Sequence, residues 1–301
     1  MLNDEIKMKR LALIKYLYRI GIEQSKQTDP YASFSILSIH DSIEMYLRLL
    51  AENLNINSDK FKFMEYWDTI PTLSYKESMR SLNAIRVSIK HKGILPSMSD
   101  IEICRVNATS FFKENTKQHF GIEFNDISLF SLVKYVDVKY YLEKSQVGLD
   151  GNNMEECIEN VAIAFDILTS TYENTKTNIY QNSPFYFENE LRLLSLISIN
   201  EWQDKVGRQK LSEFANKVKN SFERIQKSVK IMSFGIDYKK FVKFKLLTPT
   251  VSKRPDGRYI THVSERKKWT KMNCQYCIDF VLESTLKLQE FEFDLEELIE
   301  M

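Results

Sequence analysis

The sequence predicts a mainly α-helical protein, in which a helical bundle is followed by a second helical region with a small C-terminal β-hairpin. Only 8 of the 301 residues are glycine and 6 are proline, whereas 43% are hydrophobic. A chain with few helix-breaking residues and many apolar ones favours long helices joined by short turns. Apolar side chains also recur three and four residues apart along most of the chain, which is the spacing of an amphipathic helix.

Residues 1–147 are predicted to form a bundle of about five helices. The predicted helices span about residues 2–25, 32–53, 74–92, 97–112 and 126–144. Ser74 and Glu77 have the spacing of a capping box, so we expect them to start the third helix. Gly93 follows the last apolar position of that helix and is expected to end it.

The sequence GLDGNN at 148–153 marks the predicted domain boundary, because it holds two of the eight glycines. The second domain, residues 148–301, is predicted to contain helices at about 154–173, 187–206, 208–232 and 266–290. Between the last two helices, two segments rich in β-branched and aromatic residues flank a Pro-Asp-Gly turn. They predict a basic β-hairpin over about 238–263.

The net charge, the N-terminal segment and the cysteines indicate in which compartment the protein is expected. The formal net charge is +1, so overall charge points to no particular partner. The start, MLNDEIKMKRLALIKYLYRIG, lacks the apolar segment of a signal peptide, and no run of about 18 uncharged apolar residues predicts a membrane span. Four cysteines without a signal peptide favour a reducing compartment. We therefore expect a cytoplasmic protein without a membrane partner.

The motifs of several enzyme classes are missing from the sequence. It contains no glycine-rich phosphate loop, no GxSxG and no HExxH, so nucleotide hydrolysis, serine hydrolysis and zinc proteolysis are not expected. Cys274 and Cys277 form a single CxxC without two further ligands nearby, so both are interpreted as core cysteines. His40 and Asp41 form an HD pair without the further histidines of a metal phosphohydrolase. No metal and no other cofactor is predicted.

The third predicted helix ends in a cluster of basic and titratable side chains, within SLNAIRVSIKHKGILPS. Arg86 and His91 have four residues between them, Ser88 lies between the two, and Lys90 and Lys92 flank the histidine. Cations at a helix C-terminus stabilise the open carbonyls and the dipole, so a purely structural role is one interpretation. An imidazole beside a guanidinium also suits acid–base chemistry on a phosphate.

This R-x4-H sequence near the end of a late helix, in a bundle whose second helix has an acidic outer face, resembles the HEPN domain family over about residues 1–120. The resemblance implies a metal-independent RNA endonuclease, completed across a homodimer, of the kind found in toxin and phage-defence systems. It implies that Arg86 and His91 are the catalytic pair, and Ser88 could donate a further hydrogen bond to the phosphate.

Two features leave alternatives to this interpretation. Active members of the family usually have a polar residue directly after the arginine, and here that residue is Val87. The alternative is a non-catalytic HEPN-type module that binds nucleic acid or a regulatory protein partner. Asp41 and Glu44 on the second helix could support Arg86 or His91, or they could belong to a solvated face on which Glu44 pairs with Arg48.

A second basic region lies in the predicted hairpin. Residues 239–271 contain eleven Lys or Arg against two acids, with aromatic residues between them. Such a pattern predicts contact with a single-stranded nucleic acid such as RNA. The alternative is an edge strand whose lysines face solvent, with Lys243 and Lys245 alternating with apolar residues. The candidate nucleic-acid-binding residues are Lys92, Lys243, Lys245, Arg258, Lys267 and Lys268.

Overall fold

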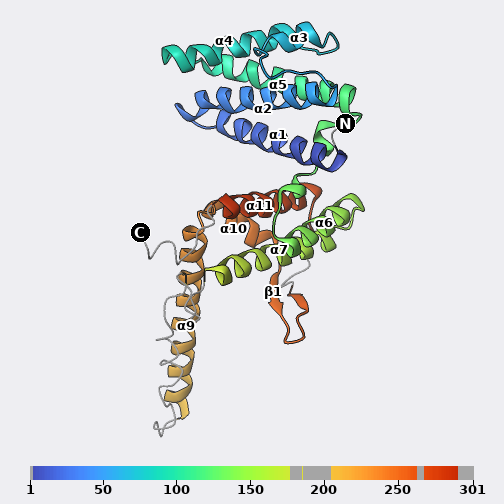
Figure 1. The fold of residues 1–301 in the computed structure, drawn as a ribbon. Coiled ribbons are helices and arrows are strands. Elements are labelled where there is room, and N and C mark those ends of the chain that lie inside the picture. The colour runs from blue at the N-terminus through green and yellow to red at the C-terminus, as the bar shows by residue number, and fades with distance from the viewer. Residues whose placement is uncertain (1–2, 177–184, 186–204, 263–267, 291–301) are drawn as a thin grey trace, which may run out of the picture. The chain divides into compact units, whose positions relative to one another are not determined.

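The computed structural model describes residues 3–176, 185, 205–262 and 268–290, and it divides the chain into two compact units, Met1–Leu132 and Val133–Met301 (Figure 1). Helices dominate both units, and one two-stranded antiparallel sheet lies near the C-terminal end of the described chain. The predicted fold class, mainly α with a small C-terminal hairpin, is confirmed. None of the helices in the described ranges has the length and apolar character needed to cross a membrane.

The first unit is a helical bundle built around one central helix. Its elements are α1 (Asp4–Ser25), α2 (Tyr31–Asn53), α3 (Glu65–Thr69), α4 (Lys76–Lys92), α5 (Met98–Phe120), and the short 3-10 helices η1 (Phe124–Asp126) and η2 (Leu129–Leu132). Helix α2 contacts α1, α4 and α5, and α1 lies along it (Figure 1). Gly21 permits this close approach, because a Cβ there would lie 2.7 Å from Cγ1 of Ile39.

Aromatic side chains fill the core of the bundle. The ring of Phe112 on α5 stacks on Phe124 with centroids 4.6 Å apart. It also makes edge contacts with Tyr18 of α1 at 5.0 Å and with Tyr46 of α2 at 5.6 Å. Since Phe112 is fully buried, these contacts tie three helices and η1 together.

The observed ends of α4 and α5 test the helix boundaries that the sequence predicts. Helix α5 begins after Ser97 with a complete capping box, and α4 ends at Gly93, whose φ is +65°. The predicted capping box at Ser74 is wrong, because α4 begins two residues later, after Tyr75 in a left-handed conformation. The hydroxyl of Ser74 instead donates to the carboxylate of Glu114 on α5, so a contact across the bundle replaces the cap.

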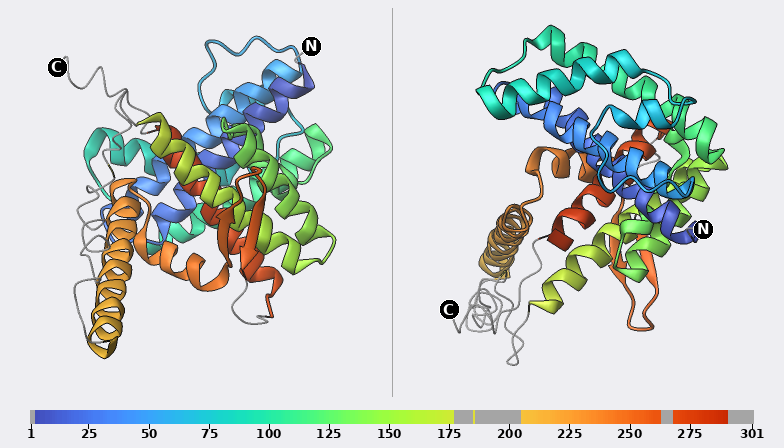
Figure 2. Two further views of the ribbon diagram at one scale, coloured as in Figure 1. Left: turned by 90° about the horizontal axis from the view of Figure 1, so that it is seen from below. Right: turned by 45° about the horizontal axis from the view of Figure 1, so that its top comes forward.

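The second unit combines five helices of the described chain with the hairpin. Its elements are α6 (Val136–Asp150), α7 (Met154–Thr175), α9 (Lys205–Ser233), α10 (Tyr238–Leu247), β1 (Thr250–Lys253), β2 (Tyr259–His262) and α11 (Lys271–Glu290). Strands β1 and β2 pair antiparallel from Thr250–His262 to Lys253–Tyr259, and both strands contact α7. The turn between them projects beyond the helices (Figure 2). The predicted helix at 187–206 lies almost wholly outside the described residues.

The glycine-containing segment at 148–153 has a different role from the predicted one. It joins α6 to α7 inside the second unit, and the division of the chain into two units falls between Leu132 and Val133. A Cβ at Gly148 would lie 2.9 Å from the backbone nitrogen of Cys157, so glycine lets the two helices pack closely. The predicted helix at 126–144 is two elements, η2 and α6, and α6 itself begins at Val136.

The prediction that 238–247 forms a strand is wrong, since these residues form helix α10. Asp237 caps the helix by accepting a hydrogen bond from the backbone N–H of Lys240, at 2.8 Å. Phe241 and Phe244, three residues apart, are both buried, and the Phe244 ring lies 4.8 Å from that of Phe280 on α11. This packing outweighs the strand propensity of the aromatic residues. The hairpin contains only β1 and β2.

The CxxC motif lies on the inner face of α11. Cys274 and Cys277 are fully buried, as is Cys157 on α7, and all four cysteines of the chain are free thiols. Burial raises the pKa of the Cys277 thiol to about 12. The thiols of Cys157, Cys274 and Cys277 are therefore protonated at neutral pH and fill the core between α7 and α11.

Candidate functional site

The R-x4-H sequence occupies the second half of α4, which ends at an exposed tip. Lys90, His91 and Lys92 form its last turn and are exposed, and the backbone N–H of Gly93 donates to the carbonyl oxygen of Ile89 at 3.1 Å. The imidazole of His91 is therefore accessible to a ligand. Cations in this last turn also complement the partial negative charge of the helix end.

Arg86 lies one turn further back and is only half exposed. Its Nε atom is buried and has no hydrogen-bond partner in the described part of the chain. Helix α4 packs on α2, and the positive charge of Arg86 acts on His40 of α2, whose pKa it lowers. Arg86 therefore lies between the bundle and solvent, with one buried donor still unused.

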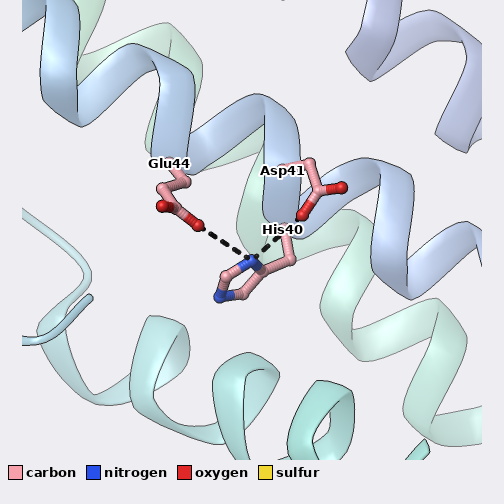
Figure 3. Close-up of side chains that lie close together, drawn as sticks. All are labelled: His40, Asp41 and Glu44. Atoms are coloured by element: carbon pink, nitrogen blue, oxygen red, sulfur yellow. Dashed lines mark ion pairs between the residues drawn. The ribbon is translucent and has the colours of Figure 1, made fainter. Parts of the chain in front are cut away.

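His40 is the centre of a polar cluster on α2 (Figure 3). Its side chain is 1% exposed, and its Nδ1 lies 3.6 Å from Oδ1 of Asp41 and 4.0 Å from Oε2 of Glu44. Its Nε2 lies 3.0 Å from Oδ1 of Asn83 on α4, and its ring stacks on Phe63 with centroids 4.2 Å apart. The imidazole thus connects the acidic face of α2 to the helix that carries Arg86.

The three side chains of His40, Asp41 and Glu44 are close enough together to hold a metal ion. Two observations oppose a cation there. The charge of Arg86 already acts on His40, and the other carboxylate oxygen of Glu44 accepts a hydrogen bond from Arg48 at 2.7 Å. A metal ion would therefore meet electrostatic repulsion from both arginines.

Burial, followed by the charge of Arg86, lowers the pKa of His40 below its ordinary value of 6.5. The hydrogen bond with Asn83 and the charges of Glu44 and Asp41 act in the opposite direction without reversing the shift. His40 is therefore neutral in the folded protein at neutral pH.

This shift predicts a pH dependence of stability. Between the folded pKa of His40 and 6.5, the unfolded chain binds more protons, so the free energy of unfolding should fall as pH falls through this range. One histidine contributes a slope of at most about 1.4 kcal/mol per pH unit. Urea unfolding between pH 7.5 and 5 should show a smaller slope for His40→Gln.

The matched control is His91→Gln, which replaces an exposed histidine and should leave the slope unchanged. His119, whose pKa burial also lowers, should maintain part of the slope in both variants. An identical pH profile for wild type and His40→Gln would contradict the assignment.

The structure brings together some of the predicted site residues and separates others. Asp41 and Glu44 lie beside His40, through which they are linked to the helix of Arg86. Ser88 is half-buried and Val87 is 37% exposed, both on the same helix as Arg86. Sequence analysis missed the role of His40; its signal was a position next to Ile39 on the apolar stripe of α2.

The predicted basic surface does not form as a strand face. Because α10 is a helix, Lys243 and Lys245 point about 200° apart around its axis. The ammonium group of Lys243 lies over the ring of Tyr276, 3.9 Å from its centroid, whereas Lys245 is half-buried near Asp166.

The other candidate basic residues lie on separate elements. Arg258 is in the hairpin turn, 3.7 Å from Asp256, and Lys268 is exposed before α11. Lys92 lies at the end of α4 in the first unit, and Lys267 lies outside the described residues. Within the described part of the second unit, Lys243 and Lys245 lie on α10 and Arg258 lies in the hairpin turn, so these three residues do not share the predicted strand face.

Comparison with protein-family models, with curated proteins and with solved structures finds no match to this chain. The functional conclusion therefore depends on the chemistry of the residues themselves.

Proposed function

We propose that the chain is a metal-independent RNA endonuclease of the HEPN type, with Arg86 and His91 as its catalytic pair. The observation that carries the proposal is the exposed imidazole of His91 at the tip of α4, about one and a half turns beyond a half-buried arginine with an unused Nε donor. A titratable group and a permanent cation in this arrangement suit phosphodiester chemistry.

In the proposed reaction, His91 accepts the proton of a ribose 2′-hydroxyl, and the 2′-oxygen attacks the adjacent phosphorus. The bond from phosphorus to the 5′-oxygen of the next nucleotide breaks. That oxygen takes up a proton from the protonated imidazole of His91. Arg86 stabilises the negative charge that develops on the phosphorane oxygens. The products end in a 2′,3′-cyclic phosphate and a 5′-hydroxyl.

Asp41, Glu44 and the neutral His40 would position the guanidinium of Arg86 in this scheme. Two carboxylates on α2 lie within 4.0 Å of His40, whose charge state responds to Arg86. Ser88 would donate a further hydrogen bond to the phosphate, and Lys90 and Lys92 would attract it electrostatically. The biological setting proposed with this activity is a cytoplasmic toxin or phage-defence effector, held inactive by a regulatory protein partner.

The site is proposed to be completed by a second copy of the chain. A composite site across a two-fold axis requires the same surface of both subunits, so we expect a dimer formed through the face that carries α4 and α5. Light scattering at micromolar concentration should give twice the chain mass of 35.6 kDa. A strictly monomeric protein would count against the nuclease.

The second candidate function is a non-catalytic module that binds nucleic acid or protein. Val87 favours it, because this apolar side chain is 37% exposed at the position where active HEPN proteins usually have a polar residue. An RNA-cleavage assay on the wild-type protein and on His91→Ala separates the two candidates. Cleavage that depends on His91 supports the nuclease, and binding of RNA without cleavage supports the module.

A further inference from the structure

A cavity of about 390 Å³ lies in the second unit, where α7, α9 and the connection from α10 to β1 meet. This volume is within the range of small-molecule sites, roughly 300–1,000 Å³. Lys230 of α9 helps to form it, since its Nζ binds Oε2 of Glu173 on α7 at 2.7 Å with both side chains largely buried. The cavity therefore lies beside a direct contact between α7 and α9.

One wall of the cavity is aromatic and apolar. Phe165 of α7 and Phe244 of α10 line it, with ring centroids 4.9 Å apart, and Ile231 of α9 lies beside them. Such a surface suits an apolar ring, because binding removes apolar area from water.

The other wall carries both ammonium and carboxylate groups. Lys227, Lys245 and Asp166 line it together with Lys230. Lys227 and Lys245 form no ion pair within 4.0 Å in the described residues, although the charge of each reaches the other and Asp166. Burial raises the pKa of Asp166, and burial together with Lys227 lowers the pKa of Lys245. Neither ammonium group is therefore fixed in an ion pair with a carboxylate of the described residues.

We propose that this cavity binds a nucleoside monophosphate. Lys227 and Lys245 bind the phosphate, the aromatic wall takes the base, and the Asp166 carboxylate accepts hydrogen bonds from the ribose hydroxyls. Glu223 also lines the cavity, so a triphosphate would bring additional negative charge towards two carboxylates. The charge of the lining residues therefore favours one phosphate over three. This site is independent of the nuclease proposed for α4.

Titration calorimetry on the full chain tests the proposal with AMP as the probe. AMP should bind with a dissociation constant in the micromolar range, about 10 µM, and ATP, adenosine, ribose 5-phosphate and inorganic phosphate should each bind at least tenfold more weakly. Lys227→Gln and Lys245→Gln should each weaken AMP binding by about tenfold or more, since each loses a charged contact to phosphate.

The matched control is Lys239→Gln, which makes the same substitution at an exposed residue of α10 outside the cavity and should leave AMP binding unchanged. Asp166→Asn adds a second readout. Wild type should prefer AMP to its 2′,3′-dideoxy analogue, and the variant should lose that preference. Thermal unfolding confirms that each variant is folded.

Three results would overturn the proposal. The first is no binding of AMP, and the second is equal AMP affinity in wild type and the two cavity lysine variants. The third is equal affinity for AMP and for inorganic phosphate, which would show an anion site without nucleotide recognition. Because the two sites are separate, variants that lose AMP binding should still cleave RNA. The calorimetry therefore tests the nucleotide site, and the cleavage assay tests the nuclease site independently.

Discussion

Replacing either Arg86 or His91 with alanine should abolish RNA cleavage while leaving the helical content unchanged. General acid–base catalysis contributes about 10²–10⁴-fold to a rate, and loss of a charge-stabilising donor costs about 10²–10³-fold. Each single variant should therefore lose at least about a hundredfold in cleavage rate. Both residues lie outside the fully buried core, so circular dichroism should show an intact fold.

Arg80→Ala is the matched control, because Arg80 is an exposed arginine on the same helix and pairs with Glu77 of the first turn of that helix, at 3.1 Å. This variant should retain cleavage. The wild-type reaction should persist in EDTA and leave DNA intact, since the proposed nucleophile is the ribose 2′-hydroxyl. Its products should carry a 2′,3′-cyclic phosphate.

Full RNA cleavage by His91→Ala would contradict the assignment of His91 as a catalytic residue. Cleavage that requires a metal ion, or equal cleavage of DNA, would contradict the proposed 2′-hydroxyl mechanism. If RNA binds and is not cleaved under any condition, the binding module with its exposed Val87 becomes the better interpretation.

Phe112→Ala should be among the most destabilising single substitutions in the first unit. Phe112 is fully buried, and its ring contacts Tyr18, Tyr46 and Phe124. Truncating a buried phenylalanine removes apolar contacts and leaves a cavity, which costs about 3–5 kcal/mol. Urea unfolding should report this loss in the free energy of unfolding.

Phe34→Ala provides the control, since Phe34 on α2 is 42% exposed. Its loss should stay within about 1 kcal/mol, because little apolar surface leaves water when this ring packs. Equal losses in the two variants would mean that the aromatic cluster around Phe112 does not hold the bundle together.

Local sequence patterns determined most of the helices of the first unit. The apolar stripe of α2, the capping box at Ser97 and the glycine after α4 each depend on residues within one or two turns. The position of Arg86 and His91 on the last two turns of α4 follows from the same local signals. These features could be predicted because the interactions that produce them involve near neighbours in the chain.

Only the tertiary structure decided which segments become partners. Residues 238–247 have a pattern compatible with a strand or a helix, and the burial of Phe244 against α7 and α11 selects the helix. His40 reaches Asn83, 43 residues away, and the cavity combines residues from α7, α9 and α10. Such contacts depend on how whole helices pack, because side chains distant in sequence meet only when their apolar faces are buried together. The sequence alone determined the helices and the motif at the end of α4, and packing decided the surroundings of that motif.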